Sequence, residues 1–290
     1  MGTKRILILG ASGMLGHVLA YRLREFGEKF DIITIARNSQ YIIPDMELDL
    51  FDFSGLRKSI EQINPDICIN AVGVLNKAAD NIQISKKLNS ELPIFLSALG
   101  NEKKFRLVHI STDCVFSGRK GNYTEIDVPD AVDNYGVTKI QGENIDANHL
   151  VIRTSIIGPE IRPHGIGLFH WFLNQEGVVK GYENVIWSGI TTLALADALI
   201  QIIQKDLKGL LHLVNNMSIS KRELLNLIQE NFTNKKRIIV GVSKPISNKT
   251  LLNTRQDCDL GLPDYSNMIS DLRSWMETYP DTYLEYLKKD

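Results

Sequence analysis

The sequence contains few cysteines and no long apolar run, and each absence narrows the class of protein. Only three cysteines, Cys68, Cys114 and Cys258, occur in 290 residues, with no CxxC pair and no Cys/His cluster at metal-ligand spacing. This pattern predicts a reducing compartment, no disulfide framework and no metal site. The apolar run at residues 6–9 is too short for a signal peptide or a membrane span. We therefore expect a cytoplasmic protein without a membrane partner.

The chain also lacks an excess of charge of either sign. Its 33 Lys and Arg residues nearly balance its 34 Asp and Glu residues, which gives a formal net charge of -1. Such a balance gives no indication of a nucleic acid or a membrane surface as partner. The length allows one large α/β domain with a smaller lobe. The sequence does not fix the oligomeric state, so a homodimer remains open.

Apolar strands alternate with amphipathic helical patterns through the first half of the chain. The predicted strands cover residues 6–9, 30–36, 46–48, 67–71, 105–111 and 150–153, and the predicted helices cover residues 13–26, 53–63, 82–99 and 135–146. Pro93 lies inside the third helix, where it predicts a kink. We predict the α/β class, with a Rossmann-type doubly wound parallel sheet.

The regular alternation ends near residue 155. Residues 158–167 are rich in proline and glycine and are predicted to form a loop. Helical patterns return at residues 192–204 and 220–232, with a strand at residues 210–214 between them, and we assign no element beyond residue 232. The predicted units are a dinucleotide-binding domain over residues 1–155 and a smaller, mainly substrate-binding C-terminal lobe over residues 156–290, with about residues 186–206 returning to the first domain.

Glycines recur at three-residue intervals between the first strand and the first helix. Gly10 permits a tight turn, Gly13 lets the backbone approach a pyrophosphate, and Gly16 lets the helix pack closely on the sheet. The helix N-terminus offers free N–H groups and a positive dipole to phosphates. A glycine triplet alone would fit a merely tight turn, but the strand before it and the helix after it favour cofactor binding. The residues predicted to bind the cofactor here are Gly10, Ser12, Gly13, Met14, Leu15 and Gly16.

The residue that ends the second strand usually selects the cofactor. An acidic side chain there holds the ribose of NAD, whereas an arginine accommodates the extra phosphate of NADP. The segment offers Arg37 and no carboxylate, so we predict NADPH and leave NADH open. The alternative is that Arg37 is only a loop cation. Asp49, with the neighbouring Leu50, is a candidate for contact with adenine, and a helix-capping role for Asp49 is equally compatible with the sequence.

Tyr135 and Lys139 are four residues apart and lie on one face of a predicted helix. A free tyrosine has a pKa of about 10, and a neighbouring ammonium favours the phenolate and lowers that pKa. Such a pair suits proton exchange with an alcohol or carbonyl while a hydride moves to or from nicotinamide. Thr112 could hold the same oxygen by a hydrogen bond. In isolation a surface Tyr–Lys pair is the simpler explanation, but its place after two βαβ halves favours catalysis.

Four segments carry a family resemblance. Residues 10–16, 111–118, 135–143 and 152–155 resemble the extended short-chain dehydrogenases/reductases, most closely the dTDP-4-dehydrorhamnose reductase (RmlD-like) group, and residues 188–196 and 209–213 resemble later segments of that group. The resemblance implies that Tyr135 donates a proton, that Lys139 binds the nicotinamide ribose, and that Thr112 holds the substrate carbonyl. It also implies that the cofactor is lined by Asn70, Ala71, Val72 and Gly73, and that Asp113 and Val115 face the sugar.

Two residues depart from the pattern of the group. Cys114 stands where rhamnose reductases usually carry an aromatic residue, and Ile156 stands where they usually carry a tryptophan. In the family both positions face the sugar, so Cys114 and Ile156 are candidate substrate-binding residues. The resemblance therefore supports hydride chemistry more strongly than it supports a rhamnose precursor as substrate. The Cys114 thiol has no base placed beside it by the motif and is expected to line the pocket or to be buried.

The resemblance implies an NAD(P)H-dependent reductase of a nucleotide-linked 4-keto-6-deoxy sugar, in deoxysugar or surface polysaccharide biosynthesis. Two alternatives stay open. One is a sugar-nucleotide epimerase of the same superfamily, whereas a dehydratase is disfavoured because no glutamate follows Asp113. The other is a non-catalytic regulatory subunit, because the regulatory subunit of methionine adenosyltransferase resembles this reductase group. The intact set of Thr112, Tyr135 and Lys139 favours an enzyme.

Overall fold

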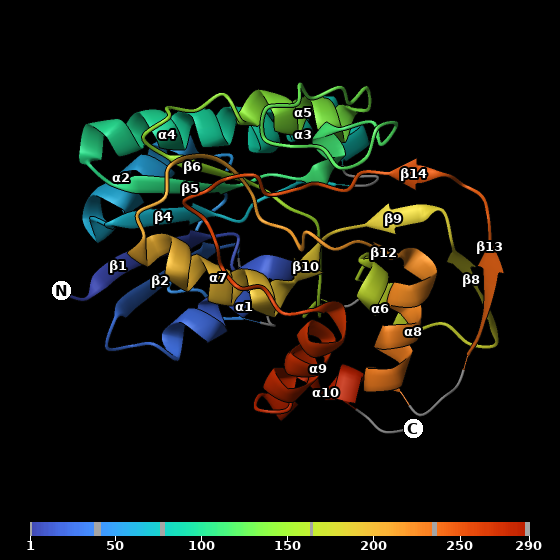
Figure 1. Ribbon diagram of the computed structural model, residues 1–290. Helices are drawn as coiled ribbons and strands as arrows, with labels where there is room; N and C mark the ends of the chain where they lie inside the picture. Colours follow the sequence, from blue (N-terminus) through green and yellow to red (C-terminus); the bar gives the residue numbers. More distant parts are fainter. Residues whose placement is uncertain (1, 38–41, 76–78, 163–164, 234–236, 288–290) are drawn as a thin grey trace.

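A seven-stranded parallel sheet forms the centre of the molecule (Figure 1). The computed structural model describes residues 2–37, 42–75, 79–162, 165–233 and 237–287. The strand order is β11-β6-β5-β4-β1-β2-β3, and every pairing within this sheet is parallel. The strands are β1 (Lys4–Leu9), β2 (Phe30–Ala36), β3 (Met46–Glu47), β4 (Ile67–Asn70), β5 (Arg106–Ile110), β6 (Leu150–Arg153) and β11 (Gly209–His212). The predicted doubly wound α/β class is confirmed.

The side chains of β1 alternate between two apolar layers. Ile6 and Ile8 pack in the larger core cluster, whereas Leu7 and Leu9 pack in a second cluster on the opposite face of the sheet. All four side chains are fully buried, as a parallel strand covered on both faces requires. One face is covered by α1 (Met14–Arg24) and α7 (Thr192–Gln204), and the other by α2 (Phe53–Ile63), α4 (Leu92–Lys103) and α5 (Asn134–Gly142) (Figure 1).

The order of the strands reverses beside β1. This strand pairs with β2 on one side and with β4 on the other, and Leu9 lies level with Ile35 and with Asn70. Crossover connections leave such a point in opposite directions, so a crevice forms at the carboxyl ends of the strands. The segments that follow β1, β2 and β4 therefore meet at this edge of the sheet.

The long helical stretch before β5 is irregular ahead of Pro93. It consists of α3 (Ile82–Ser85), a π-helical turn (Lys86–Glu91) and α4, and Pro93 lies in the first turn of α4. The prolyl nitrogen has no N–H to donate to the carbonyl of Asn89. Gly142 of α5 approaches that carbonyl so closely that an added Cβ would lie 2.0 Å from its oxygen. The irregular turn thus lets α5 pack directly against this stretch.

The remaining strands form small sheets in a second lobe. In that lobe β8 pairs with β13 in parallel, and β9 lies between β12 and β14. The elements of this part are β7 (Ile156–Ile157), α6 (Leu168–Leu173), β8 (Val178–Tyr182), β9 (Val185–Trp187), β10 (Ile190–Thr191), β12 (Ile219–Ser220), α8 (Lys221–Phe232), β13 (Ile238–Val242) and β14 (Ser247–Asn248). Part of the predicted 158–167 loop, residues 163 and 164, lies outside the described residues. The division of the chain near residue 155 stays a prediction.

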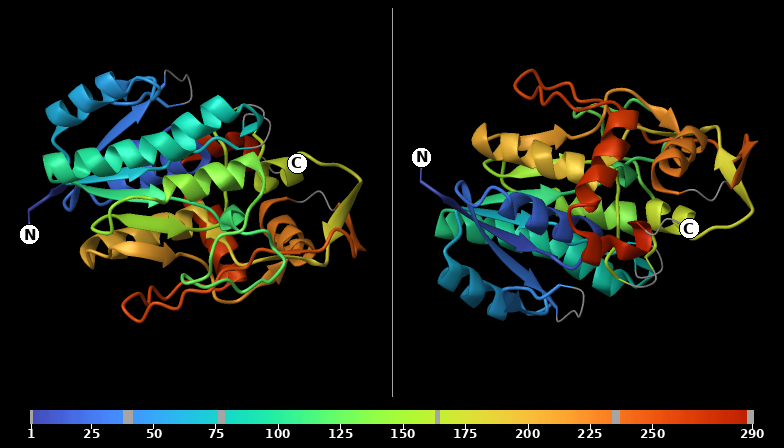
Figure 2. Two further views of the ribbon diagram at one scale, coloured as in Figure 1. Left: turned by 90° about the horizontal axis from the view of Figure 1, so that it is seen from above. Right: turned by 90° about the horizontal axis from the view of Figure 1, so that it is seen from below.

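Two C-terminal helices, which the sequence analysis did not assign, pack back against α1. They are α9 (Tyr265–Met276) and α10 (Pro280–Leu287), drawn in red across the blue N-terminal helix in the right-hand view of Figure 2, which is seen from below. Trp275 Nε1 and the Tyr279 hydroxyl both donate to Glu25, at 2.7 and 2.8 Å. The C-terminal end of the chain therefore covers the helix that begins at the glycine-rich turn. Among the described residues, no helix is both long enough and apolar enough to cross a membrane.

His17 makes the stability of this packing depend on pH. The ring is fully buried in α1, and Nδ1 lies 2.8 Å from the carbonyl oxygen of Gly13. Burial lowers the pKa of His17 from 6.5 to about 4. Because the unfolded chain binds the proton more readily, the free energy of unfolding should fall as the pH drops from about 6.5 to about 4, by up to about 3 kcal/mol.

Urea unfolding at several pH values checks this prediction when the protein is compared with the variant His17→Gln, which cannot titrate. The difference in free energy of unfolding between the two proteins should be constant above about pH 7. Below pH 6.5 the unmodified protein should lose stability relative to the variant. Parallel pH dependence of the two proteins down to pH 4 would contradict the assignment of this proton to His17.

Candidate active site

The glycine-rich turn follows β1 at the reversal of strand order. Gly10 has a φ of +85°, which glycine adopts without steric strain. An added Cβ at Gly16 would lie 2.1 Å from the carbonyl oxygen of Gly10, so the start of α1 touches the turn directly. No side chain caps α1 at Gly13, and no acidic residue occupies its first turn. The helix N-terminus therefore remains available to an anion. The structure brings together the predicted residues Gly10, Ser12, Gly13, Met14, Leu15 and Gly16.

The predicted residues after β2 and β3 lie near this turn in different environments. Arg37 is exposed directly after β2. Asp49 is also exposed, and its carboxylate accepts a hydrogen bond from the Phe51 amide at 3.1 Å. The helix-capping carboxylate of α2 belongs instead to Asp52. Leu50 is buried in the core. Asp49 therefore caps a turn and not the helix, and its contact with adenine stays a prediction.

The loop after β4 packs on the glycine-rich turn. Asn70 is fully buried, and its side chain contacts Nδ1 of His109 at 3.2 Å and accepts from the Val72 amide at 3.1 Å. An added Cβ at Gly10 would lie 3.1 Å from Val72 and 3.3 Å from Ala71. The predicted cofactor-lining segment from Asn70 to Gly73 thus lies beside Gly10, as the parallel register requires.

A buried amide that the sequence analysis did not assign connects this loop to α5. Asn89, in the π-helical turn, accepts a hydrogen bond from the Val74 amide at 2.9 Å and donates to the Val74 carbonyl at 3.0 Å. Its amide nitrogen also lies 3.2 Å from the hydroxyl of Thr138 in α5. In the sequence, Asn89 is only one of several polar residues within the predicted helix at residues 82–99, and its burial is seen only in the structure. Asn89 thus connects the loop after β4 to the helix that carries Tyr135 and Lys139.

Helix α5 presents Tyr135 and Lys139 at the end of β5. Asp133 caps the helix by accepting from the Gly136 amide at 2.8 Å. The side chain of Lys139 is almost fully buried, and its ammonium donates to the carbonyl of Ile110 at 2.6 Å. Burial lowers the pKa of Lys139 to about 8, against the opposing charge of Glu143. A buried ammonium with a fixed partner is held in one place for contact with a ligand.

Glu143 anchors the same helix to the central sheet. Its carboxylate accepts from the Ser111 hydroxyl at 2.5 Å and pairs with Arg153 of β6 at 2.7 Å. The two charged side chains are 10% and 5% exposed, so removal of either would leave the other charge buried without a partner. Arg153 also lies 3.4 Å from Nε2 of His212 in β11. This ion pair therefore fixes α5 relative to β5, β6 and β11.

Tyr135 holds its proton more tightly than the sequence analysis expected. Thr112 Oγ1 accepts from the Cys114 amide at 3.1 Å and lies 3.2 Å from the Asp113 carboxylate. Burial, with smaller contributions from Cys114 and Asp113, raises the pKa of Tyr135 above its ordinary value, and a hydrogen bond with Thr112 opposes the rise. The expectation that Lys139 lowers this pKa is wrong for the structure, because burial dominates. Tyr135 is therefore protonated at neutral pH.

Two lysines from the C-terminal lobe meet the residues after Thr112. Burial raises the pKa of Asp113, and the positive charges of Lys249 and Lys221 oppose the rise. The Lys221 ammonium lies 4.7 Å from the centre of the Trp187 ring, and burial lowers its pKa to about 8. Burial also raises the pKa of the Cys114 thiol to about 12, which agrees with an inert thiol. The pattern of the sequence did not reveal these lysines, because more than a hundred residues separate them from Asp113.

The two other predicted substrate residues are packed differently from one another. Val115 is fully buried in a small apolar cluster with Phe116, Tyr123 and Leu251. Ile156 is half-buried at the start of β7, which pairs with β10. Their contact with a sugar stays a prediction, and for Val115 the side chain serves the local core.

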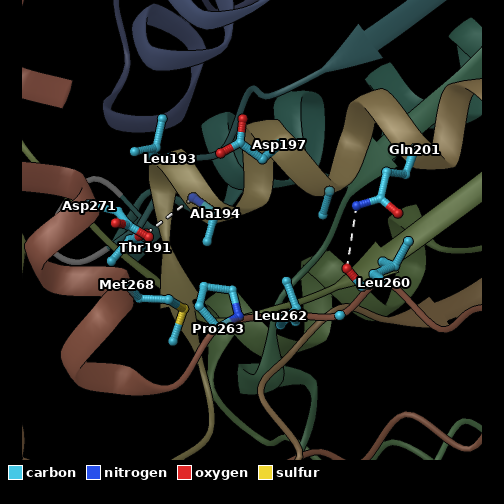
Figure 3. A pocket seen from close by; sticks show the side chains of 12 residues that line it. Thr191, Leu193, Ala194, Asp197, Gln201, Leu260, Leu262, Pro263, Met268 and Asp271 are labelled. Atoms are coloured by element: carbon cyan, nitrogen blue, oxygen red, sulfur yellow. Dashed lines mark hydrogen bonds between the residues drawn. The ribbon is translucent and has the colours of Figure 1, made fainter. Parts of the chain in front are cut away.

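A small cavity of about 90 Å³ lies apart from these residues (Figure 3). It opens between α7, the segment at residues 260–263 and α9, and its polar lining includes Asp197 and Asp271. None of the residues predicted to bind cofactor or substrate lines it. Asp197 is already paired with Arg22 of α1 at 2.6 Å. The cavity belongs to the packing between helices and not to the candidate active site.

The fold and the site together define an extended short-chain dehydrogenase/reductase. A glycine-rich turn lies at the reversal of strand order, Thr112 follows the end of β5, and Tyr135 and Lys139 lie on α5. The chain belongs to the family described as RmlD substrate binding domain, which matches residues 4–268. The resemblance stated from the sequence motifs is confirmed.

The chain is similar in sequence and structure to several named reductases. A dTDP-4-keto-6-deoxy-D-glucose reductase of Streptomyces niveus is 26% identical, over 72% of each chain. A crystal structure of a hypothetical dTDP-4-dehydrorhamnose reductase from Sulfolobus tokodaii is 29% identical, with a TM-score of 0.76 over 91% of this chain and 99% of that one. A dTDP-4-dehydrorhamnose reductase from Bacillus anthracis, in complex with NADP, has a TM-score of 0.80 at 22% identity, over 96% and 99%. Alignments with other curated relatives span about half of their length.

The contact between Gly16 and Gly10 leads to a prediction. Gly16→Ala places a methyl group against the Gly10 carbonyl and should destabilise the protein by about 1–3 kcal/mol, the usual range for overpacking. It should also weaken dinucleotide binding, because the turn has to move. Thermal unfolding and a binding titration with NADPH check both effects.

Gly73→Ala is the control for stability alone, since an added Cβ there has no atom within 4 Å but Gly73 is itself predicted to line the cofactor. The melting temperature of this variant should stay unchanged. If Gly16→Ala leaves both melting temperature and affinity unchanged, the turn does not depend on this close approach.

Proposed function

We propose that the chain is an NAD(P)H-dependent reductase of a nucleotide-linked 4-keto-6-deoxy sugar, acting in deoxysugar or surface polysaccharide biosynthesis. The observation that carries the proposal is the convergence of Thr112, Tyr135 and Lys139 at the carboxyl end of β5, on the same edge of the sheet as the glycine-rich turn. The names of the relatives support the substrate class, since one acts on a dTDP-4-keto-6-deoxy sugar and two are called dTDP-4-dehydrorhamnose reductases.

A nicotinamide dinucleotide fits the residues present. The uncapped N-terminus of α1 and the positive φ of Gly10 suit the pyrophosphate, and Arg37 suits the ribose phosphate of NADP. When bound, the cofactor supplies the hydride. Lys139 would hold the nicotinamide ribose, because its ammonium is fixed on the Ile110 carbonyl and keeps further donors free. We propose NADPH as the preferred cofactor, with NADH as the alternative.

The proton comes from Tyr135 in this proposal. Thr112 and Tyr135 together donate hydrogen bonds to the carbonyl oxygen of the sugar, which gains negative charge during reduction. Tyr135 then transfers its proton to that oxygen. The phenol is protonated at neutral pH, which a proton donor requires, although its raised pKa makes it a weaker acid than a free tyrosine.

Lys221 and Lys249 suit the charged part of the substrate. Two ammonium groups face one carboxylate, Asp113, next to Thr112, so the cluster carries an excess positive charge when all three are ionised. A sugar nucleotide brings a diphosphate with negative charge to the same side of the reacting centre. We propose that these lysines attract the diphosphate and that Asp113 orients the sugar, with Cys114, Val115 and Ile156 as the remaining predicted contacts.

Tyr135→Phe tests the proposal, because it removes the proton donor and keeps the ring. Reduction of a dTDP-4-keto-6-deoxyhexose, followed by NADPH consumption, should fall by about 10²–10⁴-fold, the usual range for loss of general acid catalysis. The dissociation constant of NADPH should change little. Val137→Ala is the matched control on α5, since Val137 is a half-buried residue that carries no proposed role.

Near-normal turnover by Tyr135→Phe would show that the proton comes from another group. If the unmodified protein binds NADPH and the sugar nucleotide but consumes neither, the regulatory reading would replace the enzymatic one. Interconversion of sugar stereoisomers without net consumption of NADPH would indicate an epimerase.

A further inference from the structure

An arginine from the second half of the chain reaches the glycine-rich turn. Arg162, in the segment between β7 and α6, donates a hydrogen bond from Nη2 to the hydroxyl of Ser12. Ser12 is buried between Gly10 and Gly13, while Arg162 is itself exposed. The contact joins residues that are 150 positions apart. It puts a guanidinium at the glycine-rich turn, from the segment at residues 158–167 that was predicted to form a loop.

A second arginine converges on the same place. Partial burial of the Arg162 guanidinium beside Ser12 and the positive charge of Arg37 both lower the pKa of Arg162, whereas the carboxylate of Glu160 acts in the opposite sense. That carboxylate is already engaged, because it accepts a hydrogen bond from the Gly167 amide at 2.6 Å. Two guanidinium groups that repel each other at one opening form a favourable environment for an anion between them.

The segment that carries Arg162 is held in place by the C-terminal helix. The Tyr286 hydroxyl of α10 accepts from the Glu160 amide at 3.0 Å and donates to the Glu160 carbonyl at 2.9 Å. The same hydroxyl lies 2.7 Å from Nδ1 of His170. An added Cβ at Gly167 would lie 2.6 Å from the terminal methyl of Met14, so the segment also packs on the first residue of α1. Arg162 is therefore presented from a fixed support.

We propose that Arg162 binds the pyrophosphate of the dinucleotide from the side opposite the α1 N-terminus. The guanidinium exchanges its hydrogen bond with Ser12 for a charge-assisted bond to a phosphate oxygen, while Arg37 holds the ribose phosphate. Pyrophosphate is common to NADH and NADPH, whereas the ribose phosphate is present only in NADPH. The two arginines therefore have separable effects. The inference rests on dinucleotide binding in the proposed function and is independent of which sugar is reduced.

Dissociation constants of NADPH and NADH, measured by fluorescence or calorimetric titration without sugar nucleotide, test this division. Arg162→Ala should weaken the binding of both dinucleotides by about ten-fold or more and by the same factor, as expected for loss of a charge-assisted hydrogen bond. Arg37→Ala should weaken NADPH binding by a similar factor and leave NADH binding unchanged.

Arg57→Ala is the matched control for the change in net charge. Arg57 lies on α2 and pairs with Glu102 at 2.9 Å, and its removal should leave both affinities unchanged. Because Arg162 is exposed, Arg162→Ala should keep the melting temperature of the unmodified protein without ligand.

Four results would overturn the inference. Unchanged affinities in Arg162→Ala would show that the contact with Ser12 contributes only to packing. Tighter binding of the dinucleotides by this variant would show that Arg162 hinders their access to the glycine-rich turn. Loss of NADPH affinity alone would assign Arg162 to the ribose phosphate. If the unmodified protein bound neither dinucleotide, the cofactor assignment of the proposed function would fail together with the inference. If the unmodified protein binds NADPH and NADH, the cofactor assignment stands, and any failure of the Arg162→Ala prediction concerns the inference alone.

Discussion

The burial of one ammonium group sets the geometry of the whole candidate site. Lys139 donates to the Ile110 carbonyl, and the helix that carries it is fixed by the buried pair between Glu143 and Arg153. A buried charge is strongly unfavourable without a partner, so α5 has little freedom to rotate or slide against β5 and β6. Tyr135, one turn before Lys139, takes its place beside Thr112 as a consequence of this constraint.

Support for both sides of the candidate site comes from the C-terminal part of the chain. On the proposed cofactor side, the C-terminal helices contact Glu25 at the end of α1, and Tyr286 contacts Glu160 in the segment between β7 and α6. On the substrate side, Lys221 and Lys249 reach Asp113 from the smaller lobe. The smaller lobe thus contributes charge beside the proposed reacting residues, of which Thr112 follows β5 and Tyr135 and Lys139 lie on α5.

Patterns that are local in sequence predicted the sheet and the placement of Tyr135 and Lys139 on one helix. The apolar run of β1 followed by Gly10 and Gly16, and the four-residue spacing of Tyr135 and Lys139, depend on neighbours along the chain. The direction of the pKa shift of Tyr135 was predicted wrongly, because burial is a property of the tertiary structure. Arg162 and the two lysines of the substrate side escaped prediction for the same reason. Helix α9, by contrast, shows apolar residues at helical spacing that could have revealed it.

The central claim is that a hydride passes from the bound cofactor to a carbonyl carbon of a nucleotide-linked sugar. Turnover with NADPH that carries deuterium at the transferable position of C4, followed by mass spectrometry and NMR of the product, tests it directly. The account predicts one deuterium per product molecule, on the carbon that bore the carbonyl, with one NADPH consumed. A product without deuterium, or a sugar nucleotide that is altered while NADPH is not consumed, would contradict the account.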